Sequence, residues 1–339
     1  MIFNLIIVII YLLLYLNFLF GISFLPIIIM YCYFSDYLLY INIIKNIIWS
    51  SVSFITYGLL FKNIYVNSNE YINEIQLNNT KSNIIISNHI LDLDFLIYTF
   101  IFSNSTLNSK NIGIAKKLVG YQLPISGFFG TLTGDIFLHR KIECDINKLN
   151  KKINFNNLLI FPEGTCFTKE RKKLSDNFCD KNKLIKFKYH LYPRITGIKT
   201  IIQFNKDIKY IYDFTIVYDK IGPNKYGKHY SIFSYLYNLY YLPNKIYISI
   251  NKYKIKNYNK IEKQIENIFY HKDKFIENFN FNNNKFIPIK YNYIKGLCCF
   301  IGINLLTLSS IYLFVKYNFI RYIYLYELIL YYIYFFLFI

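Results

Sequence analysis

Hydrophobic residues dominate both ends of the chain, whereas polar residues interrupt its middle every few positions. The first 34 residues carry no charged side chain, and as a helix they would span about 50 Å, well beyond a hydrocarbon core of about 30 Å. A second apolar stretch, 37–60, is interrupted only by Lys45, whose long side chain can reach from an apolar stem to the membrane interface. We therefore predict an N-terminal membrane anchor of one to three helices over residues 1–60. A secretory signal peptide is excluded because the run is too long and lacks a basic start.

The C-terminal end has the same character. Residues 296–315 are an uncharged run of 20, and residues 322–339 contain a single charged side chain, Glu327. Lys316 and Arg321 lie in the short link between the two runs. This pattern predicts a transmembrane helical hairpin over residues 296–339.

Between these ends, residues 61–295 combine frequent charges with short apolar runs. Four of the runs have the length and composition of strands: 83–86, 135–138, 158–161 and 210–218. The longer mixed segment 91–102 is typical of a helix. Strands that alternate with helical segments predict one α/β domain over this block.

The charge balance favours an anionic partner. The chain of 339 residues has a formal net charge of +19, which suits a phosphate-bearing substrate or an acidic lipid surface. Nucleic acid would also suit the charge, but no nucleic-acid-binding motif is present and the chain ends are too apolar for a soluble binder. A channel or transporter is excluded because the polar middle is too long and the charges within the apolar runs are too few.

The six cysteines argue against a metal site and against a disulfide framework. No CxxC pair occurs, and no histidine is spaced near a cysteine as a zinc ligand would be. We therefore expect structural thiols and no bound metal.

The first candidate for chemistry is a histidine just after the predicted strand 83–86. Asp94 follows His89 by five residues, across the start of the predicted helix. At that spacing the carboxylate can hold one imidazole nitrogen while the other accepts a proton, as in a Ser-His-Asp triad in which a substrate hydroxyl replaces the serine. The alternative is a capping histidine beside two solvated acids, Asp92 and Asp94. A single spacing of this kind also arises by chance, so it needs support from the rest of the chain.

The second candidate is the turn that follows the predicted strand 158–161. Pro162, Glu163, Gly164 and Thr165 come next, and this sequence makes a tight turn that presents backbone amides and a hydroxyl. It is either a simple strand-to-loop turn or one wall of a substrate site.

Four motifs, in this order, resemble those of the glycerolipid acyltransferase superfamily, which includes the lysophosphatidate acyltransferases. They are NHILDLD at 88–94, GDIFLHR at 134–140, FPEGT at 161–165 and YPRITG at 192–197. Residues 188–194 and 271–275 are further similar to the eukaryotic, multi-spanning lysophosphatidate and lysocardiolipin acyltransferases. The resemblance covers about residues 83–279. It implies a central, mostly parallel mixed sheet flanked by helices, with transmembrane helices at both ends.

The resemblance also implies an activity, that of a 1-acylglycerol-3-phosphate O-acyltransferase in the endoplasmic reticulum membrane, surrounded by membrane lipids. His89 would take the proton of the sn-2 hydroxyl of lysophosphatidic acid as its oxygen attacks the acyl-CoA thioester, and Asp94 would stabilise the imidazolium. Acyl-CoA is a co-substrate, and no metal or organic cofactor is expected. The residues implied in substrate binding are Asn88, Lys116, Lys117, Arg140, Glu163, Gly164, Thr165, Pro193 and Arg194.

One position departs from the family pattern inside the site. The residue after the Glu-Gly-Thr turn is usually arginine in this branch, whereas here it is Cys166. A thiol cannot bind phosphate as a guanidinium does, so the candidates to replace it are Arg140, Lys169, Arg171 or a neighbouring lysine. As an acyl-carrying nucleophile Cys166 has no activating partner near it in the sequence, so we discount that role.

The resemblance is compatible with several acyl acceptors. Besides lysophosphatidic acid, the same chemistry serves lysocardiolipin, lysophosphatidylcholine, lysophosphatidylinositol and glycerol 3-phosphate. A non-catalytic membrane scaffold that binds lipid through the same fold is an alternative of another class. Such a scaffold would be indicated by the loss of His89 or Asp94, and both residues are present.

Overall fold

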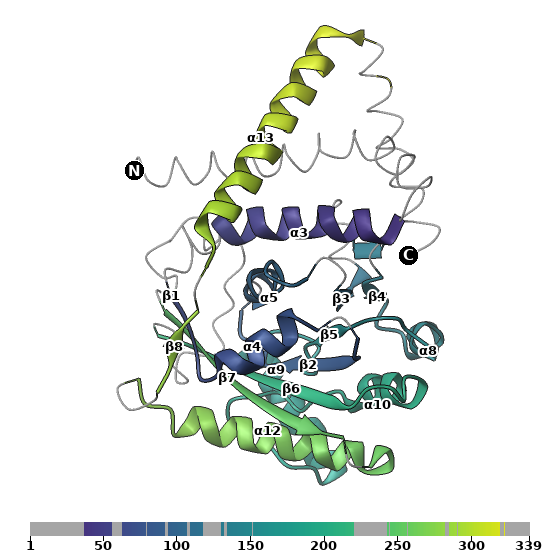
Figure 1. Ribbon diagram of the computed structural model, residues 1–339. Helices are drawn as coiled ribbons and strands as arrows, with labels where there is room; N and C mark the ends of the chain where they lie inside the picture. The colour runs from purple at the N-terminus through teal and green to yellow at the C-terminus, as the bar shows by residue number, and fades with distance from the viewer. Residues whose placement is uncertain are drawn as a thin grey trace.

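The computed structural model places an eight-stranded sheet at the centre of the molecule, with helices on both of its faces (Figure 1). It describes residues 37–55, 63–78, 80–91, 94–106, 109–117, 130–131, 134–150, 152–219, 243, 245–255, 257–281, 285–289, 291–318 and 322. The predicted α/β class is confirmed.

The sheet is mixed and mostly parallel. Its strands are β1 (Asn63–Val66), β2 (Asn83–Ser87), β3 (Asn111–Lys116), β4 (Ile136–Leu138), β5 (Asn157–Ile160), β6 (Tyr210–Tyr218), β7 (Lys245–Lys254) and β8 (Ile287–Pro288). They are ordered β4-β3-β5-β2-β6-β7-β1-β8 across the sheet. The run from β4 to β6 is parallel throughout, β1 and β7 pair in parallel, and β6–β7 and β1–β8 are antiparallel. All four predicted strands are present, with ends that differ from the prediction by at most one residue.

The central strand β2 shows why these runs become strands. All five of its residues are buried, as is typical of a parallel strand covered on both faces. Ile85 packs into the hydrophobic cluster on one face, and Ile84 and Ile86 pack into the cluster on the other. Each of the three isoleucines therefore contributes to a hydrophobic core, on one face of the sheet or the other.

Two layers of helices cover the sheet. The helices are α3 (Tyr37–Ile55), α4 (Asn69–Gln76), α5 (Asp94–Phe102), α8 (Ile142–Leu149), α9 (Lys169–Asn182), α10 (Ile195–Phe204), α12 (Ile261–Glu277) and α13 (Tyr293–Lys316), with a short 3-10 turn, η5 (Tyr258–Lys260). Side chains of α4 and α5 join the cluster on one face, and those of α10 and most of α12 join the other. Helix α3 crosses above α5, and α13 packs on α3 and extends away from the sheet (Figure 1).

Lys45 on α3 faces the domain, which corrects its predicted place at a membrane interface. It is 7% exposed, its Nζ donates to the carbonyl of Asn111 at 2.7 Å, and it lies 3.5 Å from Oδ1 of Asp135. The ring of Trp49 on the same helix stacks on Phe102 of α5 at 5.5 Å between centroids. A buried ammonium needs such partners, and Asp135, which directly precedes strand β4, supplies the charge.

No helix in the described part of the chain is both long and apolar enough to cross a bilayer. The transmembrane helices predicted at the two ends therefore have no counterpart among the described helices. Residues 1–36 of the predicted anchor and residues 323–339 of the predicted hairpin lie outside that part.

Candidate active site

The candidate site lies where the parallel strands end. His89 follows β2 by two residues, the turn 162–165 follows β5, and Arg140 follows β4 by two residues. Tyr218 is the last residue of β6. Because the carboxyl ends of parallel strands meet at one edge of a sheet, these segments converge there, where open α/β sheets bind their ligands.

His89 and Asp94 form the predicted pair. Nδ1 of His89 lies 3.0 Å from Oδ2 of Asp94, and the imidazole stacks on the ring of Phe161 with centroids 4.4 Å apart. The imidazole is 19% exposed and the carboxylate is fully buried. Because the carboxylate engages Nδ1, Nε2 is the nitrogen that can exchange a proton with a substrate.

Asp94 is held by more donors than the sequence indicates. Its Oδ2 also accepts the N–H groups of Ile90 at 2.6 Å and Leu91 at 3.0 Å, and the hydroxyl of Tyr218 donates to Oδ1. Asp94 is the first residue of α5, so its charge lies at the positive end of that helix. These contacts fix the orientation of the carboxylate and hence that of His89. Tyr218 was missed from sequence, where its only signal is that it ends a predicted strand.

Glu163 is buried and links two backbone segments of the site. It is 2% exposed, its Oε1 accepts the N–H of His89 at 3.0 Å, and its Oε2 accepts the N–H of Leu191 at 2.9 Å. Burial raises the pKa of Glu163 to about 8, against the opposing effect of the two backbone N–H donors. Both oxygens are thus engaged with backbone, so Glu163 positions the His89 segment; its contact with substrate stays a prediction.

Asn88 also positions the backbone of this segment, and its contact with substrate stays a prediction. Its side chain is bonded to both backbone groups of Ile216 on β6: Nδ2 donates to the carbonyl at 3.0 Å, and Oδ1 accepts the N–H at 2.8 Å. Asn88 is 1% exposed. It therefore extends the pairing of β2 with β6 by side-chain bonds and fixes where His89 leaves the sheet.

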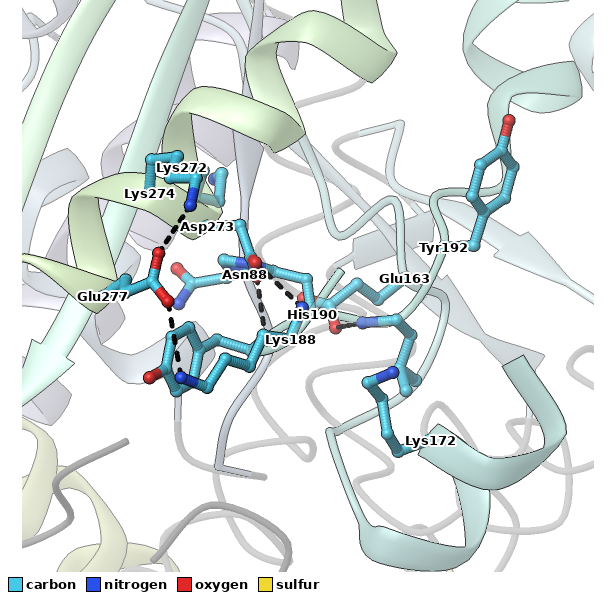
Figure 2. A network of polar contacts seen from close by, with 12 residues as sticks. Asn88, Glu163, Lys172, Lys188, His190, Tyr192, Lys272, Asp273, Lys274 and Glu277 are labelled. Atoms are coloured by element: carbon cyan, nitrogen blue, oxygen red, sulfur yellow. Dashed lines mark hydrogen bonds and ion pairs between the residues drawn. The ribbon is translucent and has the colours of Figure 1, made fainter. Parts of the chain in front are cut away.

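Behind these residues, α12 holds the segment 188–191 in place (Figure 2). Asp273 accepts the backbone N–H groups of Lys188 at 2.8 Å and Tyr189 at 2.7 Å. It also lies 2.9 Å from Nδ1 of His190. The two runs that are similar to the eukaryotic branch, 188–194 and 271–275, therefore meet in space, and through Leu191 they support Glu163.

The buried imidazole of His190 should make the free energy of unfolding depend on pH. Its imidazole is fully buried, and burial lowers its pKa to about 4. As the pH falls from about 6.5 to 4, the unfolded chain binds a proton that folded His190 does not, so the free energy of unfolding should fall by up to about 3 kcal/mol. Chemical denaturation across this range measures the slope. His190→Asn should flatten it, whereas His271→Asn, an exposed site on helix α12, should not; an unchanged slope in His190→Asn would assign the proton to another group.

Three guanidinium groups surround the turn 164–166, and we name them the arginine cluster: Arg140, Arg171 and Arg194. Arg140 donates from Nη2 to the carbonyl of Gly164, and Arg171 donates from Nη1 to the carbonyl of Cys166 at 3.1 Å. Burial, and then the charges of Arg194 and Arg171, lower the pKa of Arg140. No member of the cluster pairs with a carboxylate of the described residues.

Gly164 lets the third arginine come this close. Its φ of +70° favours glycine, and a Cβ atom built there would lie 3.1 Å from Cδ of Arg194. The backbone N–H of Arg194 also donates to the carbonyl of Pro162 at 2.7 Å. The turn and the segment 192–197 are therefore joined by backbone as well as by charge, as expected for two walls of one site.

The remaining predicted residues lie around this core. Lys116 is the last residue of β3 and pairs in register with Leu138 of β4, two residues before Arg140, and Lys117 follows directly. Thr165 and Pro193 are buried beside the arginine cluster. The side chain of Cys166 lies against His89, with Sγ 3.3 Å from Nε2.

Comparison with known proteins identifies this region. Residues 63–218 match the family described as Acyltransferase. Lysocardiolipin acyltransferase 1 of Mus musculus is 30% identical over 146 residues, 40% of this chain and 38% of that protein. Lysophosphatidylinositol acyltransferase 10 of Caenorhabditis elegans is 31% identical over 147 residues, 40% of this chain and 37% of that protein.

A third relative has a different acceptor in its name. The 1-acyl-sn-glycerol-3-phosphate acyltransferase gamma of Homo sapiens is 29% identical over 142 residues, 39% of this chain and 37% of that protein. The matched part of the chain thus spans under two fifths of the length of each of these three relatives. No solved structure gives a significant match.

Proposed function

Because this chain belongs to the glycerolipid acyltransferase superfamily, we propose that it transfers a fatty acyl chain from acyl-CoA to the sn-2 hydroxyl of lysophosphatidic acid, giving phosphatidic acid. The observation that carries the proposal is the His89–Asp94 pair beside the arginine cluster. A base next to concentrated positive charge suits a hydroxyl that lies near a phosphate.

In the proposed reaction His89 is the general base. Its Nε2 takes the hydroxyl proton as the acceptor oxygen attacks the acyl thioester, and the buried carboxylate of Asp94 stabilises the imidazolium. When the carbon–sulfur bond breaks, the imidazolium returns the proton to the leaving thiolate. A positioned base typically contributes about 10²- to 10⁴-fold in rate, so the remainder has to come from the placement of both substrates. Acyl-CoA is the co-substrate, and this chemistry needs no metal or organic cofactor.

The arginine cluster supports an anionic acceptor and compensates for the arginine that Cys166 replaces. Guanidinium groups bind phosphate through directed, charge-assisted hydrogen bonds. Of the residues that the sequence offers for this replacement, Arg140 and Arg171 both donate to carbonyls of the turn. Lys169 begins α9 and is exposed to solvent.

Arg171→Gln should raise the KM for lysophosphatidic acid roughly 10- to 100-fold, because one charge-assisted hydrogen bond is worth about 1.5–3 kcal/mol. The measurement is steady-state acyl transfer at fixed ionic strength. Lys173→Gln, at an exposed position two residues along the same helix, removes the same charge and should leave KM near the wild-type value. Transfer to monoacylglycerol, which lacks the phosphate, should not respond to Arg171→Gln; an equal effect on both acceptors would contradict a phosphate contact.

An acceptor profile tests the proposed function directly. Purified protein and labelled oleoyl-CoA are offered lysophosphatidic acid, lysocardiolipin, lysophosphatidylinositol, lysophosphatidylcholine and glycerol 3-phosphate in separate reactions. We expect the highest kcat/KM with lysophosphatidic acid. A preference for lysocardiolipin or lysophosphatidylinositol, which the names of two relatives mention, would replace our choice of acceptor and keep the reaction. Indifference to every acceptor would favour the lipid-binding scaffold.

We further propose that the protein works at the endoplasmic reticulum membrane, where both acyl substrates partition into the bilayer. Large apolar side chains along α13 support contact with lipid: Ile294 is 77% exposed, Leu305 60% and Val315 62%. Microscopy of a tagged chain beside an endoplasmic reticulum marker tests the location. Co-localisation with mitochondria would overturn it.

A further inference from the structure

Arg140 follows a strand that the sheet holds on one side. Strand β4 is three residues long and pairs with β3, and in the described part of the sheet no strand follows it on its outer side. Other contacts therefore have to fix the chain that leaves this edge. Helix α8 supplies one of them, because Nζ of Lys148 donates to the carbonyl of Phe137 at 3.0 Å. The position of Arg140 thus depends on α8 as well as on the sheet.

The backbone of Arg140 has a conformation that arginine rarely adopts. Its φ is +65°, in the left-handed region, where Cβ comes too close to the backbone. Among the described residues, Lys183 is the other non-glycine residue with a positive φ, and it is the C-cap of α9, where this conformation is usual. Arg140 precedes a helix and has no such reason. Backbone strain of this kind persists only where surrounding contacts impose it, and it is frequent at ligand sites.

Asp145 closes the turn around Arg140. Its Oδ1 accepts the N–H of His139 at 2.7 Å, and its own backbone N–H donates to the carbonyl of Lys141 at 2.9 Å. The residues on both sides of Arg140 are thus bonded to Asp145. The side chain of Asp145 is 8% exposed and lies in the first turn of α8, where the helix dipole favours a negative charge. From this buried position it constrains the turn 139–141.

The guanidinium of Arg140 needs such a constraint because of its neighbours. Its Nη2 donates to the carbonyl of Gly164, and the charges of Arg194 and Arg171 act on the same group, since after burial they lower its pKa. Like charges at short range repel each other, and the side chain of Arg140 is exposed, so an unconstrained turn would let it move away into solvent. A closed turn keeps the three guanidinium groups together for one phosphate.

We propose that Asp145 is a positioning residue for the acyl acceptor: by closing the turn 139–141 it holds Arg140 in the arginine cluster, where the phosphate binds. The inference rests on the proposed function for that phosphate. Because Asp145 acts through Arg140, its loss should weaken acceptor binding and leave the proton transfer at His89 unchanged. The alternative is that Asp145 only stabilises the start of α8, and its loss would then have the same effect with or without Arg140.

Two variants of similar size separate the acceptor oxygen of Asp145 from its bulk. Asp145→Leu removes the oxygen that binds the N–H of His139, and it should raise the KM for lysophosphatidic acid roughly 10-fold with kcat unchanged. Asp145→Asn keeps an oxygen at that place and should stay within about twofold of the wild-type KM. Glu143→Leu, which removes an exposed acid from the same turn of α8, is the matched control and should leave KM unchanged. The measurement is steady-state acyl transfer from oleoyl-CoA at fixed ionic strength.

A double-mutant cycle with Arg140 tests whether Asp145 acts through the guanidinium. Arg140→Gln alone should raise the KM for lysophosphatidic acid roughly 10- to 100-fold. Adding Asp145→Leu to Arg140→Gln should raise KM no further, because the group that Asp145 positions is already absent. Additive effects would assign Asp145 to the stability of α8 and overturn the proposal. If Asp145→Leu does not fold, Asp145→Ala, which adds no apolar bulk, takes its place in the same cycle.

The outcomes also separate this proposal from the proposed function. If Arg140→Gln raises KM but Asp145→Leu keeps the wild-type value, Asp145 does not position Arg140 and the proposed function stands. If Arg140→Gln itself leaves KM unchanged, the phosphate binds elsewhere and the positioning role is wrong for that reason. If the wild-type protein acylates no lysophospholipid, the proposed function is wrong, and Asp145 has no acceptor to position.

Discussion

His89→Ala should lower the rate of acyl transfer by about 10²- to 10⁴-fold, the usual contribution of a positioned general base. The loss should fall on kcat, because the imidazole handles the transferred proton and neither substrate is expected to depend on it for binding. The fold should survive, since His89 is joined to the rest of the site through its backbone. Its N–H donates to Glu163 and its carbonyl accepts the N–H of Phe167, and alanine keeps both bonds.

Steady-state kinetics and thermal unfolding of the same preparation make this a test of catalysis and not of folding. His271→Ala removes an exposed histidine of α12 and is the matched control; its kcat should equal that of the wild-type protein. If His89→Ala kept full acyl transfer, the enzyme interpretation of the pair would be untenable. If wild-type and variant were equally inactive while both bound lysophospholipid, the scaffold alternative would gain support.

The contact between His89 and Asp94 and the strands beside it could be predicted because their signals are local. His89 and Asp94 are five residues apart, and the apolar run before them is buried on both faces as β2. The turn after β5 has the same kind of signal, a buried run that ends in Pro162 and Glu163. In such segments the chain order alone places the side chains near each other.

The contacts that complete the site could not be predicted, because they depend on the order of strands in the sheet. Tyr218 reaches Asp94 across 124 positions, and Cys166 reaches His89 across 77. Both are possible because β5 and β6 flank β2. No local pattern encodes that order, so the sequence left Cys166 without a partner and Tyr218 without a role.

The hydrogen bonds from polar side chains to the backbone were the other feature that the sequence did not reveal. Asn88 and Glu163 belong to motifs of the acyltransferase family, and we expected both to contact substrate. In the structure each is buried, and both polar ends of its side chain are bonded to backbone groups. An unpaired buried polar group is costly, so a motif residue can be required for positioning as strictly as for chemistry. Strand β7 was also missed, because its sequence is rich in lysine. Its lysines lie near its two ends, outside its buried centre.

Lys272→Met should destabilise the protein by about 3–5 kcal/mol, the usual cost of removing one member of a buried ion pair. Nζ of Lys272 lies 2.6 Å from Oδ1 of Asp213 on β6 and donates to the carbonyl of Phe214 at 2.8 Å. Both charged side chains are at most 1% exposed. Burial raises the pKa of Asp213 and the charge of Lys272 opposes this rise. Without the lysine, Asp213 has to take up a proton or stay charged in an apolar core, and either costs stability.

The double variant Asp213→Leu, Lys272→Met decides whether the cost comes from the isolated charge. Replacing both partners of a buried pair by apolar groups is often close to neutral, so the double variant should unfold at a higher denaturant concentration than Lys272→Met alone. Lys274→Met is the matched control, because its exposed ammonium pairs with Glu277 at the surface, where a salt bridge contributes little. If Lys272→Met were as stable as Lys274→Met, the buried pair would not hold α12 against β6. Activity should follow the same order, since α12 supports His89 through Asp273, the segment 188–191 and Glu163.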